Sequence, residues 1–166
     1  MIMLTTKVIN SWNCLDNNVE IYLTEMDAYI KNNLGINCHF MLVILLQIEI
    51  NNNLEQSKDK LRDNFLKFCQ KLQNYLIINI IDPATGIFLD NCQYNIYESI
   101  DIPRVISRLE NNCYQYQECC QGKHHRWGDA VYPALILLDS TTPAEITAIL
   151  NKDVKFCNNI LSCTNI

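Results

Sequence analysis

Stretches of apolar residues, bounded by polar or turn-forming residues, divide the chain into predicted strands and helices. Residues 38–50 are rich in Val, Ile, Leu and Phe and lie between Gly35 and three asparagines. This pattern predicts a central strand that is buried on both faces. In residues 19–33, apolar side chains recur at loosely helical spacing before Gly35, which predicts a first helix.

The period of the apolar positions changes after residue 53. A stripe typical of an amphipathic helix is formed by Leu61, Phe65, Phe68, Cys69 and Leu72. Ser57 is the expected N-cap of this helix. Residues 75–81 predict a second apolar strand, and the Asp-Pro-Ala-Thr-Gly run at 82–86 predicts a turn. Residues 86–90 are then expected to return as the second strand of a hairpin.

Two further elements precede the most distinctive part of the sequence. Residues 101–111 carry apolar side chains at helical spacing and predict another helix. Residues 113–120 alternate between apolar and polar as a strand does. If this strand is regular to its end, Cys120 lies on the core side with the tyrosines, and Cys119 is the accessible thiol.

The remaining pattern predicts a loop, a strand and a helix. Residues 121–128 are expected to form the loop, and residues 130–138 a buried strand in which Pro133 indicates an edge position or a strand start. The run Thr142-Pro143-Ala144-Glu145 is a capping box with proline at the first helical position. It begins a helix that we expect to run through Leu150.

Together these elements predict a single α+β domain, with four or five strands in a mixed or antiparallel sheet and helices packed on it. A length of 166 residues is sufficient for one domain with a substantial core. We expect an irregular N-terminal segment at residues 1–17, the domain at residues 18–151, and a C-terminal tail at residues 152–166.

Composition and charge exclude several classes of function. The net charge of −5 argues against nucleic acid as a partner, because binding to phosphates requires a basic surface. The nine cysteines are odd in number and scattered, and the N-terminus lacks the pattern of a secretory signal. The longest apolar run, residues 40–46, is too short to cross a membrane. We therefore expect a cytoplasmic protein with mostly reduced thiols and no membrane partner.

The candidate chemistry is concentrated in residues 119–128. This segment contains two adjacent thiols, four basic or imidazole side chains and one of the two tryptophans: Cys119, Cys120, Lys123, His124, His125, Arg126 and Trp127. Nearby positive charge lowers the pKa of a thiol and so favours the thiolate, which is the nucleophile and soft metal ligand. Trp127 either offers a flat apolar face to a planar ligand or fills the core.

The residues alone leave several interpretations of the thiol pair open. A zinc site is disfavoured because adjacent cysteines seldom reach one tetrahedral ion together. A disulfide between neighbouring cysteines would be strained, because their Cα atoms lie closer than usual disulfide geometry requires. A Cys–His nucleophile is feasible, although no third orienting group is evident. The remaining interpretation gives these residues no chemical role: Cys120 is a buried core residue, Cys119 has no function, and the basic loop is simply solvated.

A series of motifs across residues 38–151 resembles a known family. In chain order they are Phe40-Met41-Leu42-Val43-Ile44-Leu45, Leu66-Lys67-Phe68-Cys69, Ile81-Asp82-Pro83-Ala84-Thr85-Gly86, Cys119-Cys120, His124-x-x-Trp127-Gly128 and Ser140-Thr141-Thr142-Pro143. With these motifs the chain is similar to the C-terminal domain of the cobalamin trafficking proteins called CblD or MMADHC. The sequence departs from the family in carrying Glu118, where glycine is expected, and in a shorter loop before Trp127.

The resemblance implies a flavin-free, non-enzymatic domain of the nitroreductase type. Such a domain receives cobalamin (vitamin B12) from the processing protein CblC (MMACHC) and directs it toward the methionine synthase or methylmalonyl-CoA mutase pathway. It implies that the Cys119 thiolate binds the cobalt, a soft-ligand interaction that is chemically reasonable. Cys120, His124 and Trp127 are implied as the other cofactor-binding residues. The negative charge of Glu118 would oppose formation of the thiolate.

Two alternatives from other functional classes remain at this point. The first is an oxidoreductase of the nitroreductase type that depends on flavin (FMN), which is disfavoured because basic residues for the FMN phosphate are not evident. The second is a structural or interaction module with incidental thiols, in which Cys119 would react slowly and unselectively with alkylating reagents.

Overall fold

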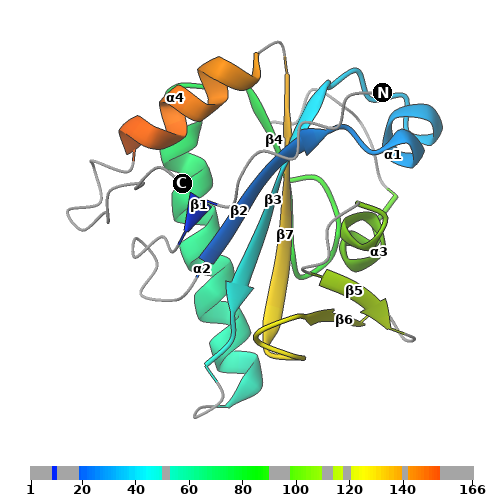
Figure 1. Ribbon diagram of the computed structural model, residues 1–166, viewed down its shortest axis with the longest axis vertical. Helices are drawn as coiled ribbons and strands as arrows, with labels where there is room; N and C mark the ends of the chain where they lie inside the picture. The colour runs from blue at the N-terminus through cyan, green and yellow to red at the C-terminus, as the bar shows by residue number, and fades with distance from the viewer. Residues whose placement is uncertain are drawn as a thin grey trace.

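A computed structural model of the chain describes residues 9–10, 19–49, 53–89, 98–109, 114–117, 121–139 and 142–153. Five antiparallel strands form the main sheet in the order β1-β2-β3-β7-β4, and β5 pairs with β6 in a separate two-stranded sheet (Figure 1). The strands are β1 (Ile9–Asn10), β2 (Val19–Glu25), β3 (Phe40–Gln47), β4 (Ile78–Ile81), β5 (Tyr114–Gln117), β6 (Gln121–His124) and β7 (Val131–Leu138). The helices are α1 (Ala28–Asn33), α2 (Leu54–Leu72), α3 (Ile102–Ser107) and α4 (Pro143–Asp153). The predicted α+β class is confirmed.

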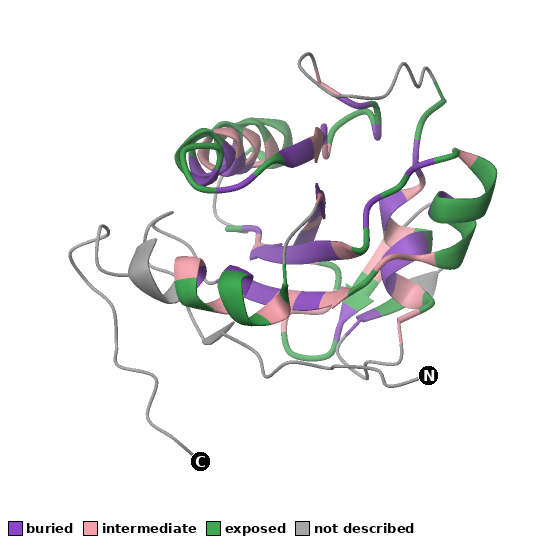
Figure 2. Ribbon diagram, turned by 90° about the horizontal axis from the view of Figure 1, so that it is seen from above, coloured by how far each residue is buried: buried purple, intermediate pink, exposed green. Residues whose placement is uncertain are grey.

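Both faces of the sheet are buried, each under a different layer. Helices α2 and α4 cover one face, and α1, α3 and the β5–β6 hairpin lie on the other (Figures 1 and 2). Alternate residues of β3 therefore enter different cores: Leu42 and Ile44 pack toward α2, whereas Met41 and Val43 pack toward α3. This double burial is why the strand reads as a continuous apolar run, as predicted.

The prediction of a helix over residues 19–33 is wrong for its first half. Val19, Ile21 and Leu23 alternate toward the core beneath α2, with the period of two that a strand requires. Only Ala28–Asn33 is helical, and the Asp27 side chain caps it by accepting a hydrogen bond from Ile30 N–H at 3.1 Å. The strand places Glu20 and Tyr22 on the opposite face of the sheet, toward the hairpin.

Strand β7 lies inside the sheet between β3 and β4, so of the two positions predicted from Pro133 the edge strand is wrong, whereas Pro133 does lie near the start of the strand, as its third residue. Asp139 N–H donates to the Ile77 carbonyl on the β4 side, and by alternation the nitrogen of Pro133 faces the same side. The β4 ladder ends where Ile81 opposes Leu135. Proline is tolerated here because β4 has already left the sheet and no ladder hydrogen bond is lost.

The helix starts follow the expected capping chemistry with one exception. Asn53, not Ser57, caps α2 by accepting from Glu55 N–H at 3.0 Å, while the Ser57 hydroxyl donates to the Glu49 carbonyl. The capping box of α4 is confirmed, since Glu145 N–H donates to Thr142 Oγ1 and Thr142 N–H donates back to the Glu145 carboxylate. Helix α4 continues to Asp153, beyond the predicted end.

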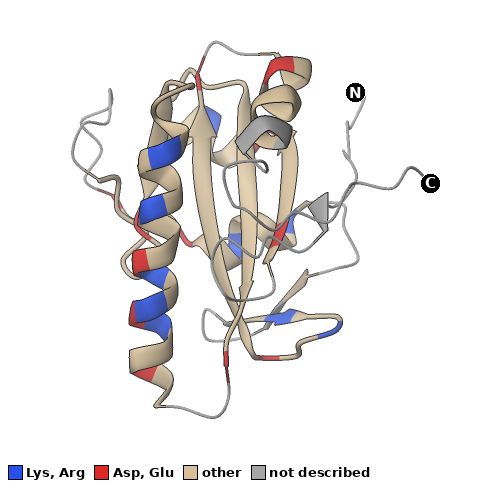
Figure 3. Cartoon of the chain, turned by 90° about the vertical axis from the view of Figure 1, so that its left-hand side faces the viewer, with Lys and Arg blue, Asp and Glu red and all other residues tan. Residues whose placement is uncertain are grey.

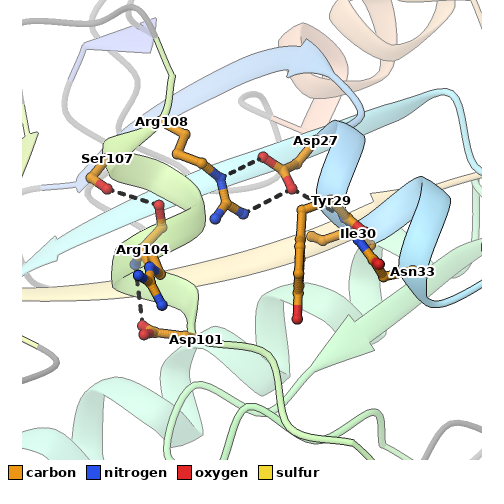
Figure 4. A network of polar contacts seen from close by, with 8 residues as sticks. All are labelled: Asp27, Tyr29, Ile30, Asn33, Asp101, Arg104, Ser107 and Arg108. Carbon is orange, nitrogen blue, oxygen red and sulfur yellow. Dashed lines mark hydrogen bonds and ion pairs between the residues drawn. The ribbon is translucent and has the colours of Figure 1, made fainter.

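Helices α1 and α3 are tied together by an ion pair (Figure 4). The Arg108 guanidinium donates to both carboxylate oxygens of Asp27, at 2.9 and 3.1 Å, and lies over the ring of Tyr29. Because Asp27 also caps α1, one carboxylate fixes the start of one helix against the end of the other. Among the described residues, none of the helices combines the length and apolar character needed to cross a membrane.

Candidate functional site

The β5–β6 hairpin brackets the predicted thiol pair. Its antiparallel register pairs Tyr114 with His124 and Gln117 with Gln121. Cys119 and Cys120 lie outside the described residues. The accessibility of the Cys119 thiol therefore stays a prediction.

The expected loop at residues 121–128 is wrong in its first half, where four residues form β6. Gly122 is what permits this strand, because a Cβ at this position would overlap the side chain of Tyr114. The buried Tyr114 ring therefore lies directly against the backbone of β6, a packing that glycine alone allows. Gly128 closes the following turn with a φ of 58°, and its amide and carbonyl exchange hydrogen bonds of 2.9 Å with those of His124.

His124 is buried at the end of β6, with 1% of its surface exposed and both ring nitrogens engaged. Nε2 lies 2.8 Å from a carboxylate oxygen of Glu20 on β2. Nδ1 accepts hydrogen bonds from the backbone N–H groups of Arg126 and Trp127, each at 3.2 Å. An Nδ1 that accepts cannot carry a proton, so the imidazole is neutral and its single proton is on Nε2, facing Glu20.

Burial lowers the pKa of His124 to about 4, with a smaller contribution from the neighbouring His125. The Glu20 carboxylate favours the protonated ring, but protonation would break both hydrogen bonds that Nδ1 accepts from the turn. Geometry and pKa therefore agree that His124 stays neutral at physiological pH.

Glu20 is the residue that the sequence analysis missed. Its carboxylate is 2% exposed, accepts a hydrogen bond from the Tyr22 hydroxyl at 2.6 Å, and pairs with His124 and with the Arg126 guanidinium. The alternation of Val19, Ile21 and Leu23 around it would have identified a strand with a lone carboxylate on its inner face. Reading this stretch as a helix concealed that position.

Trp127 is partly buried and stacks on His124, with ring centroids 4.0 Å apart and an interplanar angle of 19°. The Arg126 guanidinium lies 5.9 Å from the centroid of the indole. The stack fills the junction between the hairpin and the α3 side of the core. Of the predicted cofactor-binding residues, the structure thus brings His124 and Trp127 into direct contact.

The charges of the predicted basic segment are not equivalent. His124 is neutral and buried, and Arg126 is paired with Glu20 although 57% of its side chain is exposed. Lys123 and His125 are exposed, and helix α2 carries both basic and acidic positions along its length (Figure 3). The positive charge of this segment therefore comes mainly from Lys123 and Arg126, and the Glu20 carboxylate offsets that of Arg126.

The described residues limit the chemistry that this site can perform. They contain no group of three or more His, Cys, Asp or Glu side chains arranged to hold a metal ion. The Glu20–His124 pair has the form of a carboxylate–imidazole dyad, but backbone amides occupy Nδ1, the nitrogen that would act as a general base. The two described cysteines, Cys38 and Cys69, are buried in the two cores, and the Cys38 sulfur accepts a hydrogen bond from the Asn79 side-chain amide at 3.5 Å.

A scan against models of known protein families finds no match to this chain, and a search of curated proteins finds no similar sequence.

Proposed function

We propose that this protein is a non-enzymatic cobalamin trafficking module. It takes cobalamin from a CblC (MMACHC)-like processing partner through a bond between the Cys119 thiolate and the cobalt, and it passes the cofactor on. The Cys119 thiolate would supply the electron pair that binds the cobalt in place of another ligand, an exchange without net oxidation. No flavin takes part.

The observation that supports the proposal is the firm anchoring of strands β5 and β6, which precede and follow the thiol pair in the sequence. The residues on either side, Gln117 and Gln121, are paired, and the Glu20–His124 contact ties β6 to the main sheet. A ligand residue is held more precisely when the elements that flank it are rigid. The same hairpin contributes exposed positive charge at Lys123, which favours the thiolate.

Electron paramagnetic resonance and visible spectra of cob(II)alamin, recorded with the purified protein and a CblC-like partner, test the proposal. We expect a thiolate–cobalt spectrum in the wild-type protein that Cys119→Ser abolishes without a change in the unfolding temperature. Cys163→Ser removes a thiol elsewhere in the chain and is the matched control.

Two results would contradict the proposal. One is an identical cobalt spectrum in wild-type protein and Cys119→Ser. The other is a stoichiometric flavin in the purified protein, which would instead favour an FMN-dependent oxidoreductase.

A further inference from the structure

One buried carboxylate connects the main sheet to the hairpin that bears the thiol pair. Glu20 lies on β2, and both of its carboxylate oxygens have partners. One oxygen accepts from the Tyr22 hydroxyl on the same strand and lies 2.8 Å from His124 Nε2. The other oxygen pairs with the Arg126 guanidinium, in the turn after β6. An ionised carboxylate is costly to bury without such donors. The burial of the Glu20 carboxylate therefore depends on the donors that the end of the hairpin supplies.

The connection continues through the imidazole into the backbone. His124 donates from Nε2 to Glu20 and accepts at Nδ1 from the backbone amides of Arg126 and Trp127. The ring therefore links β2 to the turn that follows β6. On its opposite side β6 is held by the register with β5 and by the fit of Tyr114 against Gly122. A shift of β6 by one residue would turn His124 away from Glu20 and leave the carboxylate without two of its donors.

We infer that Glu20 is a positioning residue for the thiol pair. By holding His124 and Arg126, it fixes β6 against β5 and so fixes the positions of Gln117 and Gln121, the described residues on either side of the thiol pair in the sequence. This inference rests on the proposed function for the role of the thiols, but the positioning itself is measurable without cobalamin.

Two variants weaken the connection from its two ends. Glu20→Gln keeps the size of the side chain but removes the charge that faces Arg126. Arg126→Gln removes the partner from an exposed position, so it tests the inference even if Glu20→Gln fails to fold. The matched controls are Glu25→Gln, an exposed carboxylate on the same strand, and Arg104→Gln, an exposed guanidinium on α3.

The first measurement is amide hydrogen exchange of the full chain. We expect at least a tenfold faster exchange of the β5 and β6 amides in both variants, with the amides of β3 and β7 unchanged, and no effect in the controls. Uniformly faster exchange in every strand would show that Glu20 only contributes to global stability and would overturn the inference. Unchanged exchange in the hairpin would also overturn it.

The second measurement is the rate of Cys119 alkylation by iodoacetamide between pH 6 and 10. The midpoint of this profile reports the charges around the thiol, and the plateau at high pH reports its accessibility. We expect the plateau to rise at least threefold in Glu20→Gln and Arg126→Gln, and an unchanged plateau in both would contradict a positioning role. If the wild-type protein shows no cobalt spectrum, the proposed function fails while these two measurements still decide whether Glu20 positions the hairpin.

Discussion

The guanidinium of Arg62 donates two hydrogen bonds to Asp82, from Nε to one carboxylate oxygen and from Nη2 to the other, each 2.8 Å long. Asp82 also accepts from Ala84 N–H at 3.0 Å, and only 8% of its side chain is exposed. This pair joins α2 to the turn that follows β4, across one edge of the sheet. The hydrogen bond from Arg62 is the main reason that the pKa of Asp82 is lowered from its usual value of 3.8.

Asp82→Asn should therefore lower the free energy of unfolding by about 2 kcal/mol at pH 7, the scale of hydrogen bonds to charged groups. Because the pKa of Asp82 is depressed in the folded state, its stabilisation is present above pH 3.8 and is lost as the pH falls through the lowered pKa. Urea unfolding of wild type and variant at pH 7 and pH 3 should show the difference shrinking at the lower pH. Asp63→Asn, an exposed change on the same helix, is the control, and an equal difference at both pH values would contradict this prediction.

Gly86 should be far less tolerant of alanine than Gly35, although both adopt a positive φ, of 71° and 62°. A Cβ at Gly35 would meet nothing within 4 Å, so Gly35→Ala should cost about 1 kcal/mol from backbone strain alone. A Cβ at Gly86 would overlap the backbone carbonyl of Ile100, which should add about 2 kcal/mol or more.

Thermal unfolding of the two glycine variants measures the difference directly. The amide of Ile100 donates to the Gly86 carbonyl at 2.8 Å, so the neighbouring backbone cannot move aside without losing this hydrogen bond. Equal unfolding temperatures for Gly35→Ala and Gly86→Ala would show that the Ile100 segment yields, and would contradict the prediction.

The sequence predicted the parts of the fold whose pattern is local and long. The apolar run at residues 38–50 and the stripe from Leu61 to Leu72 each extend over several turns or pleats, so their period identifies them without knowledge of the partners. The capping box at Thr142 is equally local, because its hydrogen bonds join residues three positions apart.

The candidate site depends instead on contacts between distant residues. His124 and Glu20 are 104 positions apart, and no local rule connects a histidine at the end of one strand to a carboxylate on another. Strand β6 contains Gln, Gly, Lys and His, none of which favours a strand on its own. It forms because Tyr114 packs against Gly122 and because the Glu20 carboxylate accepts a hydrogen bond from His124. Both contacts join residues that are separated in the sequence, so no local pattern predicts them.

His124 should contribute a pH dependence of stability that is opposite to that of an ordinary paired histidine. Its pKa is lowered by burial from 6.5 to about 4, so between these values the unfolded state binds a proton that the folded state does not. The free energy of unfolding should accordingly fall as the pH is lowered from 6.5 toward 4, by at most about 1.4 kcal/mol per pH unit.

Nuclear magnetic resonance titration of the His124 ring, together with urea unfolding at pH 7 and pH 5, checks this prediction. His125→Gln, a change at the exposed neighbour, should leave the decrease in stability between the two pH values largely in place. A ring that titrates near pH 6.5 would mean that Nδ1 does not accept the two backbone amides, and the assignment of the neutral Nε2–H tautomer would be wrong.

The thiols should separate into unreactive and reactive groups when the folded protein is alkylated. Burial raises the pKa of Cys69, and both Cys69 and Cys38 are fully buried, so neither forms an accessible thiolate in the native state. We expect iodoacetamide at pH 7.5, followed by peptide mass mapping, to label Cys119 first and these two residues only after unfolding in urea. Lys123→Gln should slow labelling at Cys119, because it removes an exposed positive charge from the same hairpin, and should leave Cys38 and Cys69 unlabelled. If Cys69 were modified as fast as Cys119, the hairpin would provide no activation, and the thiols would be incidental to function.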